Sequence, residues 1–191
     1  MVDYNKFAAE IHEASVRKGF WDVDNAMEKH IAKMHSELSE AIQEERCNRP
    51  LLYVDDIKVL ERITDPAQFD GRKPEGVAAE LADFVMMVLD WAYVRSDIIP
   101  APDVKYLNDN VQAFKKLPLP RLVNCMHESL VLLSNDELSM PKWIQSHDTH
   151  FAFMVHGADC WLRVRGIDLV TVIRLKMEYN KSRPALHGRA Y

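Results

Sequence analysis

The chain has 191 residues and a formal net charge of −5. This length suits one compact domain, and the acidic balance excludes a strongly basic face of the kind that binds duplex nucleic acid. Hydrophobic residues make up 48% of the chain, enough for a substantial core, and only 6 glycines are present, which favours helices over a many-stranded sheet. Three scattered cysteines and the lack of a long apolar stretch predict a cytoplasmic protein without a membrane segment.

Hydrophobic residues recur at spacings of three and four along most of the chain, as they do in amphipathic helices. In chain order, the predicted helices cover about residues 4–18, 24–49, 55–63, 74–97, 104–116, 120–133, 149–165 and 168–181. Gly19 ends the first of them, Pro74 opens the fourth, and Asp168 caps the last. We therefore predict an all-α helical bundle that forms a single domain over residues 1–191.

Two short motifs place acids three residues apart, an ExxE at Glu37 and Glu40 and an ExxD at Glu80 and Asp83. Residues three apart lie on the same side of a helix, so each motif presents two carboxylates together. If the two helices pack antiparallel, the four side chains converge, and their mutual repulsion favours a bound divalent cation. Oxygen ligands without a cysteine or histidine set predict Mg²⁺, with Mn²⁺ as a substitute, rather than zinc. The alternative is that these acids belong to solvated helix faces.

The C-terminal run carries a second group of polar residues. Lys176 and Asn180 are four apart on one helix face, and Lys181 and Arg183 follow them. Such side chains form charge-assisted hydrogen bonds to phosphate oxygens, so we expect a phosphate-binding helix and tail here. A basic helix end that complements the helix dipole is the alternative.

The segment Ile98–Pro102 is the clearest break between helices, and it divides the chain into two halves, residues 1–97 and residues 98–191. A weak internal similarity suggests that the two halves are copies, because Met34–Leu38 resembles Met126–Leu130. Only one acid would survive in the second copy, with Ser129 at the place of Glu37, Leu132 at that of Glu40, His156 at that of Glu80 and Asp159 at that of Asp83. The first half would then hold the metal, and the second would be a degenerate supporting half. Chance similarity between amphipathic helices is the alternative.

Three segments resemble the MazG-like all-α nucleotide pyrophosphohydrolases: KMHSELSEAIQEER, KPEGVAAELADFVMMVLDWA and GIDLVTVIRLKMEYNKSRPALHG. The same superfamily includes dimeric dUTPases and dCTP pyrophosphatases. The resemblance covers most of residues 19–96 and 159–191, and it implies a MazG-like helical bundle. Between about Ser96 and Ala158 the chain departs from the simple family members, and either a fused pseudo-dimer or an inserted helical pair would account for the extra residues.

The resemblance also implies roles for individual residues. The four acids of the two motifs would ligate Mg²⁺: Glu37, Glu40, Glu80 and Asp83. Three residues of the C-terminal run would reach the phosphates of the substrate: Lys176, Asn180 and Arg183. Trp21 would stack on the base, or would be a core or hinge aromatic.

We therefore expect Mg²⁺-dependent hydrolysis of a nucleoside triphosphate, with deoxynucleotides favoured, to the monophosphate and pyrophosphate, as in cleaning of the nucleotide pool. Glu37 or Glu40 would orient the attacking water, and the protein would be a homo-oligomer, a dimer. One alternative is a catalytically weak or inactive nucleotide-binding relative, and another is a purely structural helical module. A zinc site formed by His147, His150 and His156 is a further alternative.

Overall fold

The fold is known from a computed structural model that describes residues 3–22, 26–54, 58–59, 72–101, 104–136 and 147–184. The described helices and strands, in chain order, are α1 (Tyr4–Arg17), α2 (Ala26–Arg46), β1 (Tyr53–Val54), β2 (Lys58–Val59), α3 (Val77–Arg95), α4 (Val104–Lys116), α5 (Leu119–Asp136), α6 (His147–Arg163) and α7 (Leu169–Lys181). The prediction of an all-α fold is confirmed, since β1 and β2 are a single pair of two-residue strands. Within the described part of the chain, no helix has the length and apolar character that a membrane span requires.

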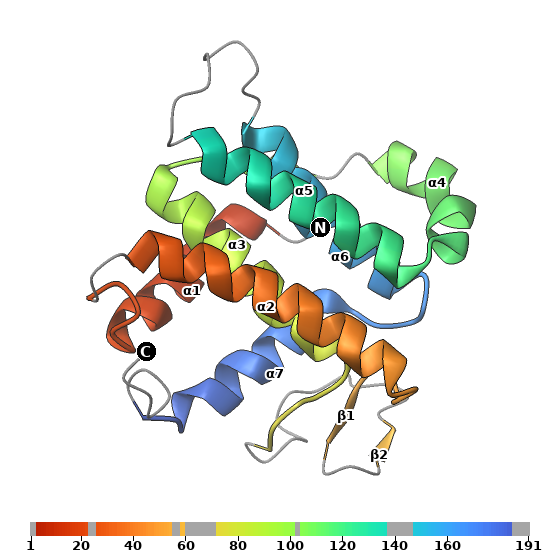
Figure 1. Cartoon of the computed structure of the whole chain (residues 1–191), viewed down its shortest axis with the longest axis horizontal. Helices are drawn as coiled ribbons and strands as arrows, with labels where there is room; N and C mark the ends of the chain where they lie inside the picture. Colours follow the sequence, from red (N-terminus) through yellow and green to blue (C-terminus); the bar gives the residue numbers. More distant parts are fainter. Residues whose placement is uncertain are drawn as a thin grey trace.

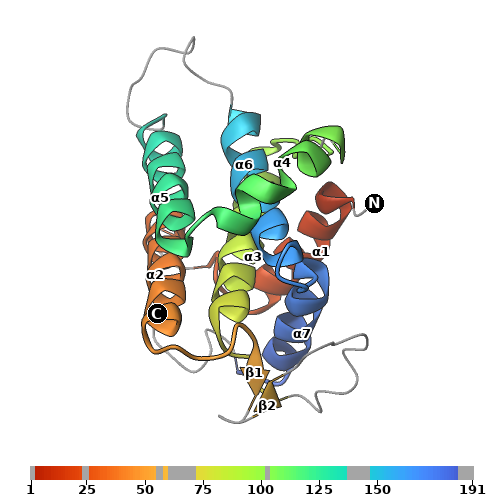
Figure 2. The same ribbon diagram turned by 90° about the vertical axis from the view of Figure 1, so that its right-hand side faces the viewer.

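Helix α3 is the centre of the molecule. It packs against α1, α2, α6 and α7, and 13 of its 19 residues are buried, so it has no face that is open to solvent along its length. The view in Figure 2 shows three layers, with α2 and α5 on one side, α3 and α6 in the middle, and α1 and α7 on the other side of α3. Two acidic residues of α3, Glu80 and Asp90, are therefore buried with it.

Most predicted helix ends are confirmed, and each has a local cause. α1 stops just before Gly19, whose φ of 79° belongs to the left-handed region that glycine adopts without a steric penalty. α7 begins after Asp168, whose carboxylate accepts a hydrogen bond from the backbone N–H of Thr171 at 2.8 Å. No described helix covers the predicted break around Ile98, since α3 ends at Arg95 and α4 begins at Val104.

The start of α3 differs from the prediction, because the helix begins at Val77 and not at Pro74. Of the two residues between them, Glu75 forms two backbone hydrogen bonds with Tyr53, at 3.0 and 2.9 Å, and is therefore held in an extended conformation. Gly76 then turns the chain into the helix with a φ of 98°. A cross-strand contact that is distant in sequence thus overrides the helix-opening preference of proline.

The short helix predicted over 55–63 is also wrong where the structure describes it. Lys58 and Val59 form strand β2, which pairs antiparallel with β1. The other residues of that prediction, 55–57 and 60–63, lie outside the described part of the chain.

Two helix pairs face each other across the bundle. The pair α2 and α3 packs against the pair α5 and α6, with α2 on α5 and α3 on α6. In Figure 1, α2 and α5 run side by side in opposite directions. His35 of α2 and His127 of α5, which the internal similarity aligns with each other, are in contact through their Nδ1 atoms at 2.7 Å. A contact between equivalent positions is what a two-fold relation produces. The duplication itself stays a prediction.

The ends of α1 are tied to distant segments. The side-chain amide of Asn5 accepts a hydrogen bond from the N–H of Ile99 at 2.8 Å and donates one to its carbonyl at 2.9 Å. At the other end, the Lys18 ammonium donates to the carbonyl oxygens of Lys181, at 3.2 Å, and of Arg183. These bonds fix both the loop after α3 and the last turn of α7 against α1.

Candidate metal centre

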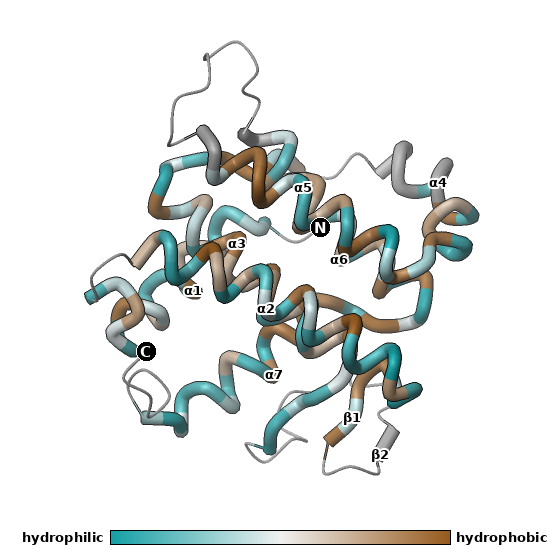
Figure 3. Tube along the Cα trace, in the orientation of Figure 1, coloured by the Kyte–Doolittle hydropathy of each residue, from teal (hydrophilic) through white to brown (hydrophobic). Residues whose placement is uncertain are grey.

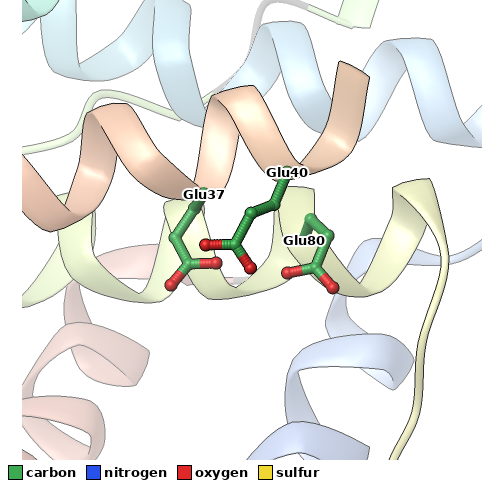
Figure 4. Close-up of side chains that lie close together, drawn as sticks. All are labelled: Glu37, Glu40 and Glu80. Carbon is green, nitrogen blue, oxygen red and sulfur yellow. The ribbon is translucent and has the colours of Figure 1, made fainter. Parts of the chain in front are cut away.

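Three of the four predicted acids come together between α2 and α3. Glu37 and Glu40 project from α2 and Glu80 projects from α3, and one carboxylate oxygen of each lies within 4.8 Å of the other two. Figure 4 shows the three carboxylates in a row, turned to the same side. Glu37 and Glu80 are buried, with exposed fractions of 4% and 8%, whereas Glu40 is exposed. The group therefore has a covered end and an end that is open to solvent.

The fourth acid, Asp83, is one turn further along α3 and is turned toward α7. Its Oδ2 accepts an ion-pair hydrogen bond from the Nζ of Lys176 at 2.6 Å. Lys176 is only 3% exposed, and its Nζ also lies 3.5 Å from the carbonyl oxygen of Pro74. The predicted phosphate-binding lysine is thus a buried counter-ion of the acids, and it neutralises the charge of Asp83 from the core side.

A second lysine, Lys33, contacts the acids from the solvent side. Its Nζ is 2.5 Å from an oxygen of Glu37, one turn further along α2, and 3.7 Å from an oxygen of Glu40. Burial lowers the pKa of Lys33, but the neighbouring carboxylates raise it more, so the side chain stays an ammonium. This residue was not among those predicted from the sequence. The signal that points to it is the spacing of four between Lys33 and Glu37, which puts both on one helix face.

Burial and the charges of the neighbouring acids disfavour the ionised forms of Glu37 and Glu80. The pKa of Glu80 is raised to about 8, chiefly by burial; the Lys176 ammonium opposes this rise, and the charges of Asp83 and Glu37 add to it. The pKa of Glu37 is also raised, chiefly by burial and then by Asp83, against the opposing effect of Lys33. At neutral pH the group therefore retains a proton that isolated glutamates would have released.

The donor set fits a hard divalent cation. All the available ligand atoms are carboxylate oxygens, which Mg²⁺ and Mn²⁺ prefer, and no cysteine or histidine belongs to the group. Two ammonium groups face four carboxylates, so the cluster keeps a net negative charge when all four acids are ionised. Glu37, Glu40 and Glu80 are the residues that could hold the ion, with Asp83 adding charge from the next turn.

The remaining polar residues of the C-terminal run lie beyond Lys176 on α7. Asn180, four residues later on the same face, and Arg183, just after the helix, are both half-buried. The guanidinium of Arg183 lies over the ring of Tyr179, 5.5 Å from its centroid. The last turns of α7 are strongly hydrophilic (Figure 3). The tail that carries His187 lies outside the described residues.

Trp21 is held in place by a buried acid. Its indole N–H lies 3.2 and 3.1 Å from the two carboxylate oxygens of Asp90, which is 2% exposed. One of these oxygens also bonds to the Nδ1 of His12 at 2.7 Å, and the ring of His30 lies 5.1 Å from that of Trp21. Asp90 was not predicted from the sequence, although a lone acid within the apolar run VMMVLDWA indicates a buried polar partner.

The second half brings no comparable set of ligands together among its described residues. His150 contacts Ser129 at 3.4 Å, His156 bonds to the carbonyl of Pro100 at 2.8 Å, and Asp159 pairs with Arg163 at 2.6 Å. Over the part of the chain that the structure describes, the three glutamates are the one group of three acids, histidines or cysteines that could share an ion. The zinc alternative therefore gains no support from His150 and His156, and the side chain of His147 is not described.

A surface hollow is found elsewhere, between the start of α1 and the end of α3, where Asn5, Tyr93 and Ile99 are among the residues that line it. It lies more than two helical turns along α3 from Glu80, so it is separate from the acids. Comparisons with family models, with curated proteins and with solved structures find no match to this chain.

Proposed function

We propose that this protein is a Mg²⁺-dependent nucleoside triphosphate pyrophosphohydrolase of the MazG-like kind, which releases pyrophosphate and leaves the monophosphate. The observation that carries the proposal is the convergence of both acidic motifs, with oxygens of Glu37, Glu40 and Glu80 within 4.8 Å of one another. The resemblance of the segments that contain these motifs to that superfamily supports the same conclusion. Neither motif would be informative alone, because acids three apart are common on solvated helices.

The acidic and the basic residues of the site would have different roles in the reaction. A divalent cation bound at the acids supplies charge neutralisation for the triphosphate and for the transition state. Glu40, the exposed member of the group, would accept a hydrogen bond from the attacking water and orient it. Asn180 and Arg183 offer donors for phosphate oxygens beyond the acids, and Lys176 supports the cluster from the core side.

Trp21 offers an aromatic face for the base, and its indole N–H is already bonded to Asp90, so the ring is held rather than free to rotate. We also propose that a deoxynucleotide is the favoured substrate, that the protein acts in the cytoplasm, and that it forms a homodimer.

Release of pyrophosphate from a panel of ordinary and modified deoxynucleoside triphosphates, with Mg²⁺ and with EDTA, tests the activity. We expect turnover of at least one nucleotide with Mg²⁺ and none with EDTA. Glu80→Gln should lower the rate by about 10²-fold or more, because it removes one charge from the ion's ligands. Glu13→Gln, which changes an acid on α1 with a side chain that is 72% exposed, should leave the rate unchanged.

Two outcomes would reject the proposal. Turnover with none of the nucleotides, at high protein concentration, excludes the enzyme. Nucleotide binding that requires Mg²⁺ but gives no product would instead favour a binding protein without catalysis.

A further inference from the structure

Two lysines touch the acidic cluster, and they differ in how firmly they are held. The side chain of Lys176 is 4% exposed and is packed between α7 and α3, with its ammonium on Asp83. The side chain of Lys33 is 47% exposed and approaches from the solvent side, with its ammonium on Glu37 and Glu40. Burial fixes the first lysine, whereas the second has a flexible stem and open solvent beside it.

The ammonium of Lys33 occupies oxygens that an ion would need. It contacts two of the three members of the group, Glu37 at 2.5 Å and Glu40 at 3.7 Å. A carboxylate oxygen that is bonded to an ammonium at this distance has its charge already compensated, and a cation that binds the same oxygen meets a positive charge. The lysine and a divalent ion therefore compete for the same site.

We propose that Lys33 is an exchangeable counter-ion, which holds the acids together when no metal is bound and which a divalent cation must displace. This inference rests on the proposed function, because it takes the three glutamates to be the ligands of the ion. Lys33 keeps its charge throughout, and the exchange is a movement of the side chain into solvent. Lys176 stays in place, since leaving Asp83 would bury an unpaired ammonium.

The exchange predicts opposite effects of one substitution on two measurements. Lys33→Met removes the ammonium but keeps an unbranched side chain of similar helix propensity. Without its counter-ion, the metal-free protein should be less stable, because the acids repel one another. The same variant should bind a divalent ion more tightly, because no resident cation has to leave. A lysine with a purely structural role would lower stability without raising the affinity for metal.

Isothermal titration of the full chain with Mn²⁺, used as the probe, measures this affinity, and thermal unfolding in EDTA measures the stability. We expect Lys33→Met to bind Mn²⁺ about 3 to 10 times more tightly than wild type, the change that corresponds to loss of a half-exposed ion pair of up to about 1.4 kcal/mol. Lys115→Met, which removes an exposed lysine of α4, serves as the charge-matched control and should bind as wild type does. Lys33→Gln replaces Lys33→Met if the latter does not fold.

The outcomes separate this inference from the proposed function. If wild type binds Mn²⁺ and Glu80→Gln weakens the binding, the metal centre is present. If Lys33→Met then binds Mn²⁺ no more tightly than wild type does, the proposed exchange is overturned and the metal centre is not. If wild type shows no Mn²⁺ binding that Glu80→Gln alters, the metal centre and the exchange fall together.

Discussion

Glu80→Gln is the substitution for which the structure makes the most detailed prediction. In the metal-free protein, the carboxyl of Glu80 has its pKa raised from about 4.5 to about 8 by burial and by its acidic neighbours. The unfolded chain releases this proton near pH 4.5, whereas the folded chain holds it until about pH 8. The folded state therefore loses stability as the pH rises through this interval, and the loss is complete above it.

The size of the effect follows from the same two values. Each pH unit between them costs at most about 1.4 kcal/mol, and the full interval would cost about 5 kcal/mol. Glu80 and Glu37 interact with each other, so the net loss of stability is smaller than this, because a proton kept on one of them lets the other ionise more easily. We therefore expect Glu80→Gln to be more stable than wild type by about 2 kcal/mol at pH 8.5 in EDTA. For a chain of this length, that corresponds to about 4–8 °C in Tm.

Thermal unfolding in EDTA, followed by circular dichroism from pH 4.5 to 9, measures this difference. The Tm values of the two proteins should coincide near pH 4.5 and separate as the pH rises. Added Mg²⁺ should raise the Tm of wild type at pH 8.5 more than that of Glu80→Gln, because the ion replaces the proton. A variant that is less stable than wild type at pH 8.5, or a difference that does not depend on pH, would refute the electrostatic account of the cluster.

Three further predictions concern the neighbouring structure. Lys176→Met removes a buried ammonium from the acids and should lower the free energy of unfolding of the metal-free protein, measured by urea denaturation, by about 3 kcal/mol. Lys181→Met, which breaks an exposed ion pair, should change this free energy little. Gly76→Ala places a Cβ 2.7 Å from two backbone oxygens at a φ of 98°, and it should lower the free energy of unfolding by at least about 3 kcal/mol. Gly166→Ala is the control, because its φ of 83° is also positive but its Cβ enters open space, and it should lower the free energy of unfolding by about 1 kcal/mol. Burial lowers the pKa of His127, so the Tm of wild type should fall as the pH drops below about 6.5. His127→Gln should make the Tm depend less on pH in this range, and a variant whose Tm falls with pH as steeply as that of wild type contradicts the prediction.

The acid cluster could be predicted because its geometry is mostly local. A spacing of three on a helix places Glu37 beside Glu40, and the same rule applies to the pair on α3. The apolar stripe next to each pair determines which way the two helices face, so the convergence of the pairs follows from their packing. Helix ends such as Gly19 and Asp168 were predictable for the same reason, since each depends on the backbone within one turn.

The remaining features depend on contacts between residues far apart in the sequence. Asp83 is turned toward Lys176, which lies 93 positions later in the chain, and no rule of helix spacing predicts that contact. The backbone bonds between Tyr53 and Glu75 likewise come from the return of the chain past β1, and they delay the start of α3 against a local preference. Lys33 is the exception, because its spacing from Glu37 was visible in the sequence and only the burial of that glutamate shows why it matters.

The position of α3 also governs how the molecule opens. Amide protons exchange with solvent deuterium fastest in segments that separate from the rest with few broken contacts, and slowest in an element enclosed on all sides. Because four helices surround α3, its amides should be the last to exchange, while those of α2, which keeps one face in water, exchange earlier. An ion that joins the two helices would therefore protect α2 most, and the bound state would appear as slower deuterium uptake along residues 33–40 rather than along the helix that carries Glu80.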